Sequence, residues 1–101
     1  MKTYNLNGKL NSEKPTIVIG EKAYSVDDRQ STFMKMNDLL QKDSTNFEAL
    51  FCLVFGEDNG HEIYNMDLSV SDTETLITAI FAAIKGITLE EAEETFRSND
   101  K

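Results

Sequence analysis

The chain has 101 residues, 40% of them hydrophobic, and a formal net charge of −8. This length suits one domain, and the hydrophobic content suffices for a core, which excludes wholesale disorder. The charge is uneven, because residues 43–101 carry three Lys/Arg and thirteen Asp/Glu, a net charge of −10. Phosphate backbones repel such an acidic surface, so we expect no direct binding to nucleic acid.

The sequence indicates a soluble protein of the cytoplasm. Its single cysteine, Cys52, can form no internal disulfide, and it lies in an apolar run where cysteine usually acts as a small hydrophobic residue. The first residues contain no apolar signal core, and no stretch approaches the roughly 20 apolar residues that a bilayer span requires. We therefore expect a cytoplasmic location and no contact with a membrane.

Residues 1–26 are expected to form β-structure. Two β-prone runs flank Gly20, and glycine as the first central residue suits a type II′ hairpin turn. This turn pairs Ile17 with Tyr24, and it places both on one face with Ile19. That face must pack on helices, because an isolated hairpin is only marginally stable in water.

Residues 27–101 are expected to be helical, because their apolar residues recur every three or four positions. The expected helices cover residues 29–42, 46–55, 60–66, 72–85 and 89–97. Asp27 is expected to cap the first helix, and Leu89, Ala92 and Phe96 form the apolar stripe of the last. Capping boxes are expected at Thr45 with Glu48, Ser71 with Glu74 and Thr88 with Glu91. The chain is thus predicted to be one α+β domain, residues 1–101, with an N-terminal antiparallel hairpin or small sheet packed on four to five helices.

Motifs for catalysis or metal binding are scarce. His61-Glu62 matches the start of a zinc-protease motif, but the position that needs a second histidine is Asn65. Cys52 and His61 could pair as nucleophile and base, yet the apolar run around Cys52 should raise its pKa, and no motif supplies a third, orienting group. We therefore predict that the protein is not an enzyme and binds no metal or cofactor.

Two helices, residues 47–55 and 76–84, are apolar on almost every side. In the first, the phenylalanines are expected to face the core, and the opposite side must find cover or form an exposed patch of the kind that marks partner sites. The same holds for the alanine side of the second, Ala79, Ala82 and Ala83. We expect a homo-oligomer. The candidate surface for a partner or for self-association comprises Met34, Ala49, Cys52, Leu53 and Met66.

The order of elements carries a family resemblance. A hairpin at residues 17–29 leads directly into a helix with Met36, an acidic helical region follows, and then come Met66-Asp67-Leu68-Ser69 and the glutamate-rich last helix. Over residues 16–97 this order resembles the tail assembly chaperones of long-tailed phages and prophages of Gram-positive bacteria. The N-terminal stretch, residues 4–14, is less typical of them.

The resemblance implies a non-enzymatic function. Such chaperones coat the long, apolar, helical tape-measure protein in the bacterial host cytoplasm while the tail tube polymerises around it. It also implies homo-oligomers and a frameshift-extended form of the same chain, of which this sequence would be the short form.

Two other classes of function stay open. The first is a small acidic inhibitor or adaptor that acts by protein–protein binding, for example as a nucleic-acid mimic with carboxylates at phosphate-like spacing. Double-stranded DNA would then compete with it for its target. The second is an enzyme with an unrecognised active site, which would need a convergent pair of perturbed titratable groups in a pocket.

Overall fold

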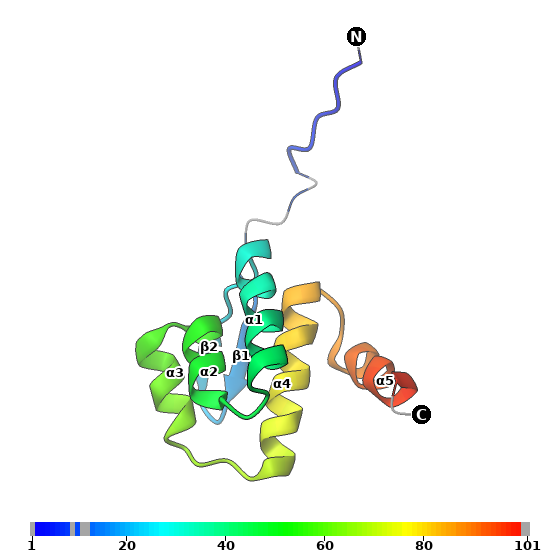
Figure 1. Ribbon diagram of the computed structural model, residues 1–101. Coiled ribbons are helices and arrows are strands. Elements are labelled where there is room, and N and C mark those ends of the chain that lie inside the picture. The colour runs from blue at the N-terminus through cyan, green and yellow to red at the C-terminus, as the bar shows by residue number, and fades with distance from the viewer. Residues whose placement is uncertain (1, 9, 11–12, 100–101) are drawn as a thin grey trace.

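The computed structural model describes residues 2–8, 10 and 13–99, and the side chains of all of these except residues 96–99. An antiparallel hairpin precedes five helices (Figure 1), which confirms the predicted α+β fold. The elements are β1 (Thr16–Ile19), β2 (Lys22–Ser25), α1 (Gln30–Lys42), α2 (Phe47–Phe55), α3 (Glu57–Tyr64), α4 (Val70–Lys85) and α5 (Leu89–Asn99). The side chain of Phe96, which the sequence places on the apolar stripe of α5, lies outside the described residues.

The hairpin has the predicted register, with Ile17 opposite Tyr24. Gly20 supplies the positive φ, 66°, that a type II′ turn requires at its first central residue. Tyr24 is 1% exposed, whereas Val18 on the other face is 67% exposed. One face of the hairpin therefore packs on the helices, as its alternating sequence predicts.

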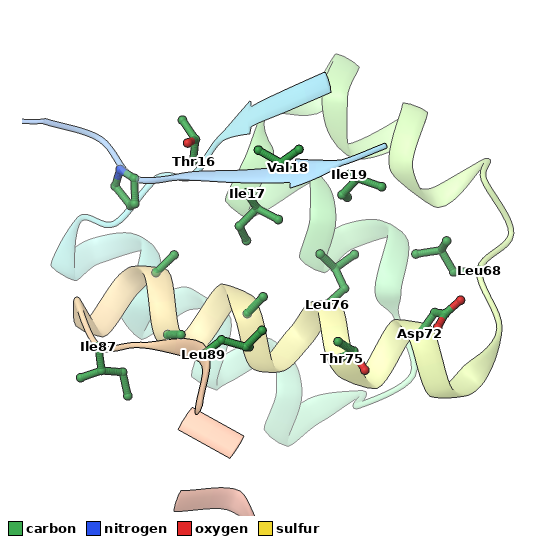
Figure 2. Close-up of a pocket in the computed structure, with 14 residues that line it drawn as sticks. Thr16, Ile17, Val18, Ile19, Leu68, Asp72, Thr75, Leu76, Ile87 and Leu89 are labelled. Carbon is green, nitrogen blue, oxygen red and sulfur yellow. The ribbon is translucent and has the colours of Figure 1, made fainter. Parts of the chain in front are cut away.

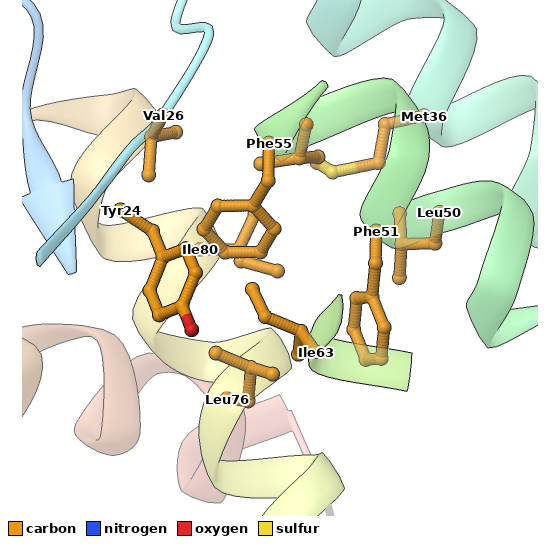
Figure 3. Packing of buried hydrophobic residues seen from close by; sticks show 10 residues of the cluster. Tyr24, Val26, Met36, Leu50, Phe51, Phe55, Ile63, Leu76 and Ile80 are labelled. Atoms are coloured by element: carbon orange, nitrogen blue, oxygen red, sulfur yellow. The ribbon is translucent and has the colours of Figure 1, made fainter. Parts of the chain in front are cut away.

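A single core joins the hairpin to α1, α2, α3 and α4. Figure 3 shows Tyr24 pointing from β2 toward Phe55 of α2, and the two rings meet edge to face with centroids 6.0 Å apart. The Asp27 backbone N–H also donates to the Val54 carbonyl over 2.9 Å, which fixes the chain between β2 and α1 on α2. The most deeply buried side chains are Tyr24, Val26, Met36, Leu50, Val54, Ile63 and Ile80.

Helix α3 begins earlier than the sequence suggested. It starts at Glu57, directly after Gly56, whereas the sequence predicts a start at Gly60. Gly60 instead lies inside α3 and against α2, where a Cβ atom would clash with the Cα and backbone nitrogen of Cys52. The glycine is thus explained by close packing of two helices and not by a helix boundary.

Only one of the three predicted capping boxes forms. The Thr88 hydroxyl accepts from the Glu91 N–H over 3.1 Å, and the Glu91 carboxylate accepts from the Thr88 N–H over 3.0 Å. Asn46 caps α2 and Ser69 caps α4, in place of the predicted Thr45 and Ser71.

Local hydrogen bonds explain two of the errors. Thr45 is held by Asp43, to which its hydroxyl donates over 2.7 Å. Asp27 does not cap α1, because its carboxylate accepts from the backbone and guanidinium of Arg29, the residue at the N-cap position. Asn and Asp side chains readily form such local bonds, and these compete with capping.

Two segments project from this body in Figure 1. Helix α5 lies beyond α4, to which it connects through Gly86, and it buries Ala92. Residues 2–8 extend away from the helices, with Tyr4 80% exposed.

Candidate protein-binding groove

An open apolar groove of about 590 Å³ runs between β1 and α4. β1 forms one wall and one side of α4 forms the floor, and the connection from α4 to α5 closes one end (Figure 2). In Figure 2, Ile17 and Leu76 point toward each other across it. The lining is aliphatic except for a few polar side chains such as Thr75 and Asp72.

Small side chains make up much of the floor. Ala79, Ala82 and Ala83 all face the groove from α4, so the helix backbone lies close to the open space. The distance between two packed helices depends on the side chains at their contact, and small ones permit a close approach. This floor therefore suits an apolar helix or strand from another chain.

The wall formed by β1 is the edge of a sheet. The sheet that the structure describes has two strands, and the Val26 N–H extends their pairing by donating to the Pro15 carbonyl over 2.9 Å. In an antiparallel ladder the hydrogen-bonded pairs alternate, so Ile17 directs its backbone groups toward β2, and Thr16 and Val18 direct theirs toward the other edge. An edge of this kind is a template for a further strand.

A second, more polar hollow of about 500 Å³ lies between α2, α3 and α4. Phe47 and Phe51 line it, together with the exposed Tyr64 and Val70. Asp67 and Glu74 also face it. These carboxylates make it a poorer site for an apolar partner than the groove between β1 and α4.

A cluster of polar side chains ties the hairpin to α3. Glu62 accepts from the Lys22 ammonium over 2.8 Å and from the Tyr24 hydroxyl over 3.0 Å. The bond from Lys22, followed by that from Tyr24, lowers the pKa of Glu62, and burial followed by the bond to Glu62 raises the pKa of Tyr24. Both carboxylate oxygens of Glu62 thus accept hydrogen bonds from β2. The role of the cluster is structural, because these bonds connect the hairpin to α3.

The cysteine and histidine considered as a nucleophile and base have other partners. The Cys52 thiol donates to the Glu57 carbonyl over 3.7 Å, and His61 Nδ1 lies 3.2 Å from a Glu48 carboxylate oxygen. Burial, followed by the charges of Glu48 and Glu57, raises the pKa of Cys52, as its apolar surroundings predict. This keeps the sulfur in its less reactive thiol form.

The structure distributes the sequence-predicted surface residues over three segments. Met34 is 61% exposed on α1 and Met66 is 38% exposed after α3, whereas Ala49, Cys52 and Leu53 are half-buried on α2. Helix α3 covers α2 at Cys52, and Leu53 packs against the core. The side of α2 that needed cover has therefore found much of it within the chain.

The groove is the feature that sequence reasoning located only in part. The sequence indicates that the alanine side of α4 needs cover, and in the structure these alanines form the groove floor. The opposite wall, β1, could not be assigned, because nothing local in the sequence specifies which helix the hairpin will contact. The run of small apolar residues along one side of α4 is the signal in the sequence that points to the site.

No protein-family model, curated protein or solved structure matches the chain. Among the described residues, no helix is both long and apolar enough to cross a bilayer, and no three His, Cys, Asp or Glu side chains gather as ligands for a metal ion.

Proposed function

We propose that this protein is a non-enzymatic tail assembly chaperone that binds and solubilises a tape-measure protein in the cytoplasm of a bacterial host. The observation that supports this proposal most is the open groove between β1 and α4, because its aliphatic lining and alanine floor match an apolar helix. Further partners under this proposal are other copies of the chain and a frameshift-extended form of it.

The chemistry of the groove suits reversible binding of a helix. An amphipathic helix can lay its apolar stripe in such a groove, with contacts repeated every three or four residues. Each apolar side chain that leaves water contributes about 1.5–3 kcal/mol, and association costs several kcal/mol in lost freedom of motion. A single groove therefore binds weakly, and a long client would be held by several copies and released as the tail forms.

The acidic surface supports the same role. Between Asp43 and Ile84 the sequence has no Lys or Arg, and Glu90, Glu91 and Glu93 are all exposed on α5. A high net charge keeps a protein with open apolar surface in solution. A complex with an apolar client would gain solubility from the same charges.

The test is co-expression with the tape-measure protein encoded in the same genome. We expect the soluble fraction of the tape-measure protein to rise and the two proteins to co-purify. Ala79→Glu places a charge on the groove floor and should abolish both effects. Ser71→Glu adds the same charge at an exposed position of α4 outside the groove and should leave both intact.

Two results would contradict this proposal. The first is a tape-measure protein that stays insoluble and unbound with the wild-type chain. The second is co-purification that Ala79→Glu, folded as judged by circular dichroism, leaves unchanged. Binding to a DNA-binding enzyme with competition by double-stranded DNA would instead establish the acidic inhibitor.

A further inference from the structure

The segment before β1 carries exposed apolar side chains in a strand-like pattern. Tyr4 is 80% exposed and Leu6 is 55% exposed. Residues two apart lie on the same face of an extended chain, so these two share a face, and Thr3 and Asn5 occupy the other. The segment thus presents an exposed apolar face, and it ends in a turn at residues 7–8, where the Asn7 N–H donates to the Asn5 side chain over 2.9 Å.

The chain enters β1 in an extended conformation. The Pro15 carbonyl is bonded to the Val26 N–H, so the hairpin pairing continues beyond Thr16. The residue before a proline is restricted to extended conformations, which applies here to Lys14. Figure 2 shows the chain before Thr16 continuing in the line of β1, and Figure 1 shows residues 2–8 leading away from the body.

The groove of another copy has the features that such a strand requires. Thr16 and Val18 direct backbone groups toward the edge that β2 leaves open, and an aliphatic hollow lies beside that edge. Strand addition uses this combination, since main-chain hydrogen bonds supply affinity and a pocket receives every second side chain.

Charge also favours this pairing. Residues 1–14 contain three Lys and one Glu, a net charge of +2, whereas residues 43–101 carry −10. Asp72 lies in the groove lining itself. Complementary charge of this kind steers association and sets which surfaces meet.

We infer that residues 3–7 of one copy add as a strand to the β1 edge of a second copy and insert Tyr4 and Leu6 into its groove. Each copy carries both the segment and the groove, so the exchange either closes into a reciprocal dimer or continues into a larger assembly. This inference goes beyond the proposed function, and its test requires no tape-measure protein. Under it, the chaperone's groove is covered by a further copy until a client displaces the segment.

Sedimentation velocity over micromolar to submillimolar concentrations tests the role of the apolar face. The variant with Tyr4→Ser and Leu6→Ser should weaken association at least about tenfold, because burial of one such side chain is worth about 1.4 kcal/mol or more, the equivalent of a factor of ten. The matched control, Thr3→Ser with Asn5→Ser, changes the opposite face and should associate like the wild type. A wild-type chain that stays monomeric, or two variants that behave alike, would overturn the inference.

A paramagnetic label identifies the occupant. A spin label is attached at Asn5→Cys, on the face away from the groove, in a Cys52→Ala background, and this chain is mixed with an isotope-labelled wild-type copy. We expect line broadening in the isotope-labelled copy at Val18, Thr75 and Ala79. Broadening only when label and isotope share one chain would show that the segment folds back on its own groove, and broadening centred on Met34 would place it elsewhere. Either result contradicts exchange between copies.

Discussion

The absence of a side chain at Gly60 is what allows α2 and α3 to lie in backbone contact. An added Cβ would clash with two backbone atoms of Cys52 and come within 2.7 Å of the Phe51 carbonyl carbon. These are backbone atoms of a packed helix, which cannot move aside as the tip of a flexible side chain can. Close packing at this point is therefore specified by one residue.

Gly60→Ala should accordingly destabilise the protein, although alanine is the better helix former by about 1 kcal/mol. Overpacking of this kind typically costs about 1–3 kcal/mol in the free energy of unfolding. Urea denaturation at neutral pH measures it, with Asp58→Ala at an exposed position of α3 as the control. A Gly60→Ala chain as stable as the wild type would show that α2 and α3 do not pack this closely.

Asp27 fixes the entry to α1 through its charge. Its carboxylate accepts from the Arg29 guanidinium over 2.8 and 2.9 Å and from the Arg29 N–H over 3.2 Å. The Arg29 guanidinium above all, with a smaller contribution from the Thr32 hydroxyl, holds the pKa of Asp27 well below its usual range against the opposing effect of burial. The ionised form is therefore the one that stabilises the fold.

The lowered pKa of Asp27 predicts how the stability of the fold depends on pH. Because the pKa is lower in the folded state, the stabilisation is complete above the unfolded value of about 3.9 and is lost as pH falls toward the folded value. Asp27→Asn keeps an acceptor for the Arg29 N–H but removes the charge, and it should cost about 0.5–1 kcal/mol at pH 7. The difference between variant and wild type should narrow in denaturation curves recorded below about pH 4. A difference that is constant with pH would contradict this account.

At the scale of elements, α5 is the helix least supported by the core. It packs mainly on α4, and its start depends on the capping box of Thr88 and Glu91. Thr88→Ala removes the hydroxyl acceptor and should cost about 1 kcal/mol of local helix stability. Hydrogen exchange should then quicken in α5 and stay unchanged in α2, because local opening need not involve the whole fold.

Thr95→Ala is the matched control, because its hydroxyl donates to the Glu91 carbonyl within α5 and caps no helix end. It should change exchange in α5 far less than Thr88→Ala does. Equal effects of the two substitutions would show that the capping box does not set the stability of α5.

Local patterns predicted the elements well and their caps less well. The turn at Gly20 was enough to set the hairpin register, and the predicted starts of α1, α2, α4 and α5 lie within two residues of those observed. The caps were harder because the sequence offers two candidates side by side, such as Thr45 and Asn46. Which of them caps the helix depends on where tertiary packing lets the helix begin.

The groove could also be predicted only in part, because it depends on a contact between residues far apart in the sequence. The alanine side of α4 is visible in the sequence as apolar surface without cover. Its partner wall, β1, is more than fifty residues away in the chain, and no periodicity records that contact. Likewise, the half-buried position of Cys52 follows from α3 folding back on α2, which a pattern within one helix does not reveal.

In the molecule as a whole, an acidic surface accompanies an accessible aliphatic groove. The body carries its negative charge on exposed positions and keeps one aliphatic groove between β1 and α4. A rigid core below the groove, with Tyr24 and Ile80 almost fully buried, holds its walls in place. The described part of the molecule thus combines an acidic surface with an aliphatic groove.

The most direct test of this account is a titration of the isotope-labelled chain with a synthetic apolar helix of the tape-measure protein, followed by the shifts of backbone amide signals. If the client binds in the groove, the largest shifts fall in β1 and on the alanine side of α4, at Val18, Ala79 and Ala83, and Ala79→Glu abolishes them. Shifts that centre on Met34 and Met66, or no shifts at all, would contradict the groove as the site of binding.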